Sequence, residues 1–209
     1  MFKSNKIIGI VAFVVIVGCV GKFFYKQLSG RTKVNVEPFR ALGALAADAT
    51  SKLLPTGGKV VVLSVDTAKY NIATLDTLLS SFKKGLKGGI TILSVEHFKI
   101  PSHTFLALSA GSLVPPSAEF APGQFEKIVQ THGNADAIVS FVGLPASWSG
   151  SASGLQQRHS KIIVVSSRDS ELLGLLRSRI IDLAIVPRAE TSNGKGSNNS
   201  PYEVLTSDK

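Results

Sequence analysis

The sequence predicts an α/β fold: a mainly parallel sheet of about five strands with helices on both faces, preceded by an N-terminal transmembrane or signal helix. Three observations support this fold class. Strand-like runs alternate with helix-like segments between residues 37 and 188, those runs are continuously apolar, and a charge-free run lies near the N-terminus. Continuous apolar strands that alternate with helices are typical of a Rossmann-like parallel sheet buried on both faces and joined by right-handed crossovers.

The expected domain organisation has three parts. Residues 1–33 form a membrane anchor, or a lipoprotein signal, followed by a basic linker. Residues 34–189 form a single α/β domain. The tail over 190–209 is rich in Gly, Asn and Ser, so we expect it to be disordered and polar.

The N-terminal run IIGIVAFVVIVGCVG, residues 7–21, contains no charged residue and follows two lysines. A helix over this run spans about 22 Å, less than the roughly 30 Å hydrocarbon core of a bilayer. Extension through the aromatic residues 23–25 closes the gap if the ammonium group of Lys22 reaches the headgroups. The run therefore predicts a single-pass membrane anchor.

A second interpretation of the same run is a lipoprotein signal. The residues IVGC at 16–19 resemble a bacterial lipobox and make Cys19 a candidate lipidation site. Mature lipoproteins begin with a polar tether, whereas the apolar and basic VGKFFYKQL follows here. An ordinary cleaved signal is a third alternative. The positive-inside rule favours a cytoplasmic domain, but a signal anchor that begins with lysines favours an extracytoplasmic one, which is the orientation we expect.

The formal net charge of +9 is concentrated at the N-terminus. Residues 1–33 hold six of the 23 basic residues and no acidic residue, so 17 basic and 14 acidic residues remain for the rest of the chain. This balance, without an RNA-recognition motif or zinc-finger spacing, argues against nucleic acid as a partner. The expected partners are membrane lipid, bound through the N-terminal segment, and a small polar ligand or a protein.

The domain begins with an amphipathic segment whose first turn holds Pro38 and which ends at Pro55. Its apolar residues recur at helical spacing, so we expect a helix that packs on the domain or binds a partner. The elements expected after it are strands over 59–66, 89–98, 135–145, 161–167 and 183–188, and helices over 71–87, 122–133 and 170–182. Two long connections, 101–121 and 145–160, are typical of functional or mobile loops.

The sequence lacks the motifs of common enzymes. A single cysteine cannot form an intramolecular disulfide, and the four histidines do not have the spacing of metal ligands. No GxGxxG, GxSxG, HExxH or Walker lysine is found in the sequence. We therefore expect no metal, no cofactor and no catalytic residue, and we interpret the chain as a membrane-tethered, non-enzymatic binding or assembly module.

Ligands of open α/β sheets bind at the carboxyl ends of the strands. The residues expected there form a candidate ligand-binding set: Asp66, Thr67, His97, Trp148, Ser166 and Arg168. An aromatic ring beside carboxylate, guanidinium and hydroxyl groups suits a polyol or another small polar ligand. Two alternatives stay open. Trp148 anchors its own loop to the core, or Asp66 acts with His97 or Arg168 in a small-molecule enzyme.

The succession KVVVLSVD, long helix, ITILSVEHF, helix, DAIVSFVGLP, KIIVVSS resembles one lobe of the type I periplasmic sugar-binding proteins over residues 58–168. The resemblance implies that Asp66 and Ser166 contact a ligand. The chain has room for one lobe, whereas the clamshell closure of that family needs two. The segment LLRSRIIDLAIVPR is also similar to part of the type II binding fold.

Overall fold

The computed structural model describes residues 35–66, 72–99, 118–121, 123–145, 158–166, 170–188 and 200–206. These residues form helices and strands in the alternating order that the sequence predicts. The helices are α2 (Glu37–Leu53), α4 (Ala73–Gly85), α6 (Gln124–Thr131) and α8 (Ser170–Arg177). The strands are β1 (Gly58–Val65), β2 (Ile90–Phe98), β3 (Ala137–Ser140), β4 (Lys161–Val165), β5 (Leu183–Pro187) and β6 (Tyr202–Thr206).

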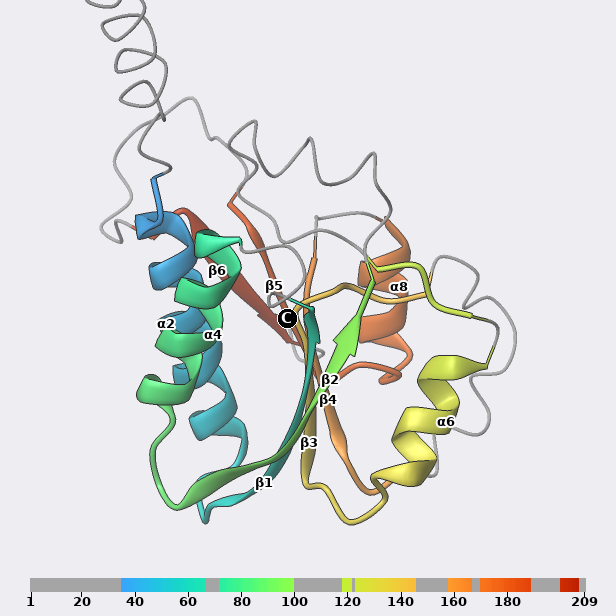
Figure 1. The fold of residues 1–209 in the computed structure, drawn as a ribbon. Helices are drawn as coiled ribbons and strands as arrows, with labels where there is room; N and C mark the ends of the chain where they lie inside the picture. Colours follow the sequence, from blue (N-terminus) through green and yellow to red (C-terminus); the bar gives the residue numbers. More distant parts are fainter. Residues whose placement is uncertain are drawn as a thin grey trace, which may run out of the picture. The chain divides into compact units, whose positions relative to one another are not determined.

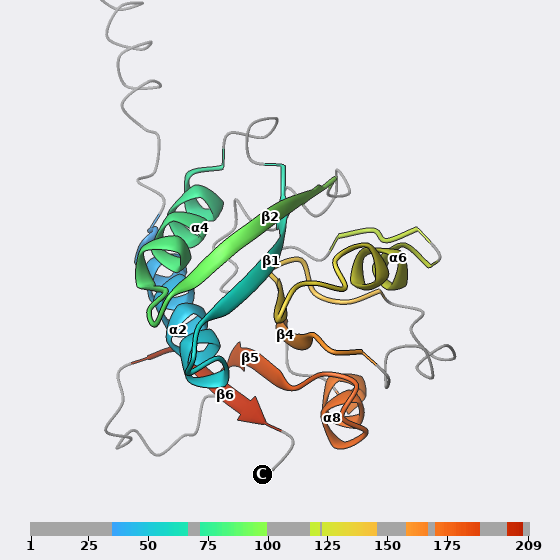
Figure 2. The same cartoon turned by 90° about the horizontal axis from the view of Figure 1, so that it is seen from below.

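All six strands belong to one sheet, in the order β2-β1-β3-β4-β5-β6. The first five are parallel to their neighbours, and β6 is antiparallel to β5. Helices α2 and α4 cover one face of this sheet and α6 and α8 cover the other (Figures 1 and 2). The predicted parallel sheet with helices on both faces is therefore confirmed, with six strands in place of about five.

The sixth strand corrects the prediction of a disordered tail. Tyr202–Thr206 pairs with β5, and Tyr202 is only 2% exposed. The short sequence YEVLT combines an aromatic and a β-branched residue, which favour strands, but the polar residues around it dominate the average composition of the tail. The strand signal of these five residues was therefore hidden when the composition was averaged over the whole tail. Residues 190–199 and 207–209 lie outside the described residues.

The predicted N-terminal anchor over 1–33 also lies outside the described residues. Among the helices that the structure does describe, none combines the length and the apolar character that a membrane crossing requires. The structure therefore does not test the predictions made for Cys19 and Lys22.

The apolar strand runs form the core. Every residue of β1 from Val60 to Val65 is buried, as are all four residues of β3 and four of the five in β4. This pattern matches a parallel sheet sandwiched between two helical layers. Phe82 of α4 meets Phe141, just after β3, edge to face at 5.2 Å between ring centroids.

Helices α2 and α4 pack closely because glycines face the neighbouring helix. A Cβ atom at Gly43 would lie 2.3 Å from the carbonyl oxygen of Leu78, and one at Gly85 would lie 2.8 Å from Cβ of Ala47. Phe39 and Leu42 of α2 are buried against the core. The expectation that this first helix packs on the domain is confirmed.

The amino edge of the sheet is closed by a repeated aspartate motif. Asp136, directly before β3, donates its backbone N–H to the carbonyl of Lys59, and its carboxylate accepts the backbone N–H of Lys59 at 2.7 Å. Asp182, directly before β5, makes the same pair of bonds with Ile162 of β4, at 2.8 Å for the carboxylate. Both carboxylates thus hold the beginnings of neighbouring strands together.

Candidate functional site

The carboxyl edge of the sheet contains the point where strand order reverses. The chain passes from β1 to its neighbour β2 on one side, while β3, on the other side of β1, leads to β4. In open α/β sheets, this switch point is where ligands bind, because the connections leave in opposite directions and open a crevice. Here it lies between the end of β1 at Val65 and the end of β3 at Ser140.

A tight turn directly follows β3 at this switch point. The buried Ser140 hydroxyl donates to the carbonyl of Gly143 at 2.6 Å and lies 3.4 Å from the backbone N–H of Val142, which donates to it. Gly143 has φ 72°, a left-handed conformation that glycine adopts without steric cost. Ser140 therefore shapes the turn and is not the free hydroxyl of a nucleophile.

The structure brings two of the predicted residues to one corner of the sheet. Asp66 directly follows β1, and its backbone N–H donates to the carbonyl of Phe98 at 3.1 Å. His97 of β2 is exposed, and its Nδ1 lies 3.4 Å from the carbonyl oxygen of Val65, the residue before Asp66. The backbone of Asp66 and the imidazole of His97 are thus held beside the switch point.

Ser166 lies at the same edge but farther along the sheet. It directly follows β4, is half-buried, and donates its backbone N–H to the carbonyl of Ile185 at 3.1 Å. Because β3 separates β4 from β1, Ser166 lies roughly 10 Å from Asp66 across the sheet. The remaining predicted ligand contacts, Thr67, Trp148 and Arg168, lie outside the described residues.

Two features at or near this edge were not predicted from the sequence. Glu96 of β2 pairs with His132 at the end of α6, at 3.0 Å between Oε1 and Nε2, and also accepts a bond from Ser94. Tyr202, opposite Pro187 at the carboxyl end of β5, has its pKa raised to about 12 by burial. Neither was accessible to sequence reasoning, because His132 is remote in the chain and Tyr202 fell in the expected tail.

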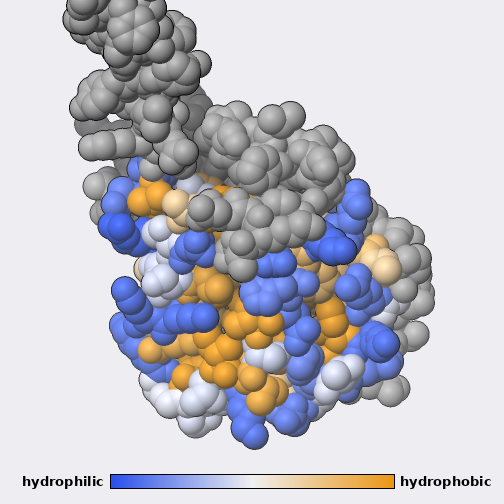
Figure 3. All heavy atoms as spheres, in the orientation of Figure 1, coloured by the Kyte–Doolittle hydropathy of each residue, from blue (hydrophilic) through white to orange (hydrophobic). Residues whose placement is uncertain are grey.

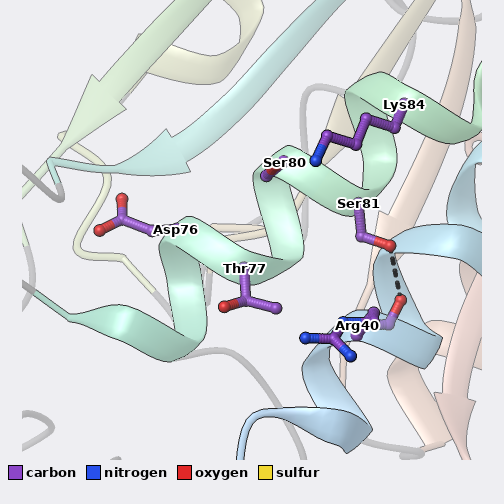
Figure 4. Close-up of a pocket in the computed structure, with 6 residues that line it drawn as sticks. All are labelled: Arg40, Asp76, Thr77, Ser80, Ser81 and Lys84. Atoms are coloured by element: carbon purple, nitrogen blue, oxygen red, sulfur yellow. Dashed lines mark hydrogen bonds between the residues drawn. The ribbon is translucent and has the colours of Figure 1, made fainter.

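A shallow hollow of about 470 Å³ lies on the helical face and not at the carboxyl edge. Its lining residues come from α2 and α4: Arg40, Asp76, Thr77, Ser80, Ser81 and Lys84. Ser81 donates to the main-chain carbonyl of Arg40 at 2.8 Å, and Asp76 points away from Arg40 (Figure 4). Because these charged groups do not converge on one point, we do not assign the ligand site to this hollow.

Metal binding finds no support among the described residues, where no group of three His, Cys, Asp or Glu side chains is close enough to hold an ion. The arrangement at the carboxyl edge is one of hydrogen-bonding groups spread over several strands. Such a row suits the recognition of a ligand with several hydroxyl groups.

No family model matches the chain, and no curated protein matches it. Several solved structures do match it. An ABC transporter solute-binding protein from Burkholderia graminis, in complex with D-arabinose, has a TM-score of 0.54 and 16% identity, covering 81% of this chain and 60% of that protein. The arabinose-binding protein AraP from Geobacillus stearothermophilus has a TM-score of 0.50 and 14% identity, with 81% and 61% covered.

A third structure of this kind is GanP, a glucose-galactose binding protein from Geobacillus stearothermophilus. It has a TM-score of 0.50 and 18% identity, with 82% of this chain and 60% of that protein covered. The chain thus spans about three fifths of the length of the solved structures it matches. The resemblance to the periplasmic sugar-binding proteins is confirmed at the level of the fold: this chain folds like them.

Proposed function

We propose that this protein is a membrane-tethered, non-enzymatic module that binds a small polyhydroxylated ligand at the carboxyl edge of its sheet. The ligand class is a monosaccharide such as D-arabinose, glucose or galactose, the sugars named for the structural neighbours. Residues 1–33 serve as the anchor, and the domain lies on the extracytoplasmic side.

The observation that carries the proposal is the position of Asp66. It directly follows β1 at the switch point between β1 and β3, with the imidazole of His97 anchored at the neighbouring carbonyl. A carboxylate accepts two sugar hydroxyls at once, and hydrogen bonds to charged groups are the stronger ones. Ser166 supplies a hydroxyl farther along the same edge, and Thr67, Trp148 and Arg168 complete the proposed set.

A direct test uses the sole tryptophan of the chain as a reporter. The purified full chain is titrated in mild detergent with D-arabinose, D-galactose and D-glucose while Trp148 fluorescence is recorded. We expect a saturable change with one of these sugars. The substitution Asp66→Asn should weaken that binding about tenfold or more, since it removes a charged hydrogen-bond acceptor.

The matched control is Asp48→Asn, the same chemical change on the exposed surface of α2, where Asp48 pairs with Lys52. This variant should bind like the parent chain. Calorimetry repeats the titration without relying on Trp148. Equal loss of binding in both variants, or no binding of any sugar, would contradict the proposed site.

The membrane anchor has its own test. In the preferred interpretation Cys19 is a residue of the span, so Cys19→Ala should leave the chain in the membrane fraction with an intact N-terminus by mass spectrometry. A diacylglyceryl-modified Cys19 as the first residue would establish the lipoprotein alternative instead.

The position of His97 beside Asp66 also supports a second candidate function, a small-molecule enzyme. In that case Asp66 acts with His97, which serves as a general base, or with Arg168. Turnover of a bound sugar, lost in His97→Asn with binding retained, would favour the enzyme over the binding module.

A further inference from the structure

The strand β2 forms one end of the sheet and has an open edge. It pairs with β1 only, so the backbone groups along its other side have no strand beside them in the described structure. Nine residues of strand run about 30 Å. Of these nine, only Phe98 is fully buried, whereas β1 is buried from Val60 onward. Open edges of this length are templates for pairing with another strand.

A bulge in β2 turns an apolar side chain outward at this edge. Val60 pairs with Ile92 and Val61 with Ser94, so Leu93 is an extra residue without a partner on β1. Leu93 is 41% exposed, and among the described residues it is the one large hydrophobic side chain that is exposed. Hydrophobic residues gather on the surface over β2 in the same view (Figure 3). The bulge therefore creates an apolar point on the open edge.

Helix α4 and the residue that follows it add two half-buried leucines, Leu79 and Leu86, near this edge. The side of α4 that packs on α2 is marked by Leu78 and Ser81, which lie against Gly43 of α2, and by Gly85, which lies against Ala47. Leu79 lies on another side of this helix, with Asp76 three residues before it and Lys83 four residues after it. Leu86 directly follows the last residue of the helix. Both leucines are only partly buried. The side of α4 away from α2 thus carries Leu79 between an acidic residue, Asp76, and a basic residue, Lys83.

We propose that β2 and this side of α4 form a self-association surface, and that its occupant is a second copy of this chain. The pattern of charges on α4 is the reason for choosing a second copy as the occupant. About a twofold axis perpendicular to the sheet, β2 pairs antiparallel with its copy and α4 runs antiparallel to its copy, so Asp76 of each chain faces Lys83 of the other. The same operation brings Leu79 of the two chains together near the axis and covers Leu93 at the joined edge.

This arrangement produces one continuous twelve-stranded sheet, twice the six strands of a single chain. Both copies present α2 and α4 on the same face of the joined sheet. The two carboxyl edges point in opposite directions, so that the proposed ligand sites stay separate. Self-association is therefore independent of ligand binding in this proposal.

Cysteine cross-linking tests the surface in the full chain. In a Cys19→Ala background, single cysteines replace Thr91, Leu93 or Val95. Near a twofold axis, one of these residues lies opposite its own copy, within the 4.4–6.8 Å between Cα atoms that disulfides need. We expect at least one variant to form a covalent dimer under mild oxidation in membranes.

The matched control is Leu205→Cys, a half-buried leucine on the opposite edge strand, β6. It should remain monomeric under the same oxidation. No dimer from any β2 variant, an equal yield from Leu205→Cys, or cross-linking only to a protein of another mass would overturn the proposal. The first result would mean that the bulge protects the edge, and the second that the cross-links come from random collisions. The third would mean that another chain is the occupant.

Charge reversal tests the arrangement of the helices. Lys83→Glu places two carboxylates against each other across the axis and should reduce the cross-linked yield several-fold. The further change Asp76→Lys restores opposite charges and should recover the yield. Circular dichroism confirms that both variants fold. A yield that stays low in the double variant, or that never falls in the single one, would contradict the antiparallel pairing.

Discussion

The two edges of the sheet use aspartate in different ways. At the amino edge, Asp136 and Asp182 each bind a backbone N–H of the neighbouring strand, and Asp182 also pairs with Arg158 at 2.7 Å. At the carboxyl edge, Asp66 directly follows a central strand at the switch point, where its own backbone N–H is the group that bonds to the adjacent strand. The position of a carboxylate relative to the strand direction therefore separates structural from candidate functional aspartates.

This difference has a physical origin. A residue before a parallel strand meets the first free N–H of its neighbour, and a carboxylate satisfies that donor. A residue after a strand lies where connections diverge, which is the edge at which ligands bind in open α/β sheets. Substitutions at the amino edge should therefore affect stability, and those at the carboxyl edge should affect binding.

The largest effect on stability is expected for Asp182→Ala. The change removes the carboxylate from Arg158, whose side chain is 7% exposed, and from the backbone N–H of Ile162. Loss of one partner of a buried pair costs about 3 kcal/mol or more in the free energy of unfolding. Urea unfolding followed by circular dichroism measures it. A loss below about 1 kcal/mol would show that Arg158 is satisfied by its carbonyl partners alone.

A smaller loss is expected for Asp136→Ala, because its carboxylate accepts one backbone N–H and pairs with no cation among the described residues. Because Lys59 is exposed, water replaces the lost acceptor, and the loss should be about 1 kcal/mol. Gly58→Ala attacks the same contact, since the added Cβ would lie 2.8 Å from Oδ2 of Asp136. In the Asp136→Ala background, Gly58→Ala should cost less than it does alone. Additive losses in the urea experiment would disprove this coupling.

Tyr202→Phe should change the alkaline limb of the stability profile. Burial raises the pKa of Tyr202 to about 12 from its model-compound value of 10.0, so folding favours the neutral phenol. The associated stability is complete below pH 10 and is lost as the pH rises through 12. The Phe variant should lose less stability over this window than the parent chain. Parallel profiles for the two proteins would indicate that Tyr202 does not control the transition.

The smallest effect on stability is expected for Asp66→Asn, at about 0.5 kcal/mol, because asparagine keeps the size and a hydrogen-bonding oxygen of aspartate and the backbone N–H bond to the carbonyl of Phe98 is unchanged. Thermal unfolding of this variant beside Asp182→Ala compares the two edges directly. A loss at Asp66 as large as that at Asp182 would remove the distinction between them.

The sequence predicted the fold well because the signals for it are local. The runs KVVVLSV and KIIVV are buried strands in any context, and the helical spacing of Phe39 and Leu42 needs no partner to be recognised. The sheet order and the strand β6 were less accessible, because they depend on pairing between distant residues. For the same reason, the contact between Glu96 and His132 has no sequence signature.

The candidate site was predictable only in part. Strand ends are visible in the sequence, so Asp66, His97 and Ser166 were placed at the correct edge. Their distribution along that edge depends on strand order, which puts β3 between Asp66 and Ser166. That the aspartates before β3 and β5 serve the amino edge became evident from their backbone contacts alone.

The most direct test of a ligand site at the carboxyl edge is an amide chemical-shift titration. The full chain, labelled with ¹⁵N and held in detergent micelles, is titrated with the sugar that changes Trp148 fluorescence most. We expect saturable shifts at Asp66, His97 and Ser166, and none at the amino-edge amides of Lys59 and Ile162. Shifts confined to the amino edge, or to the α2–α4 hollow around Arg40, would contradict the account.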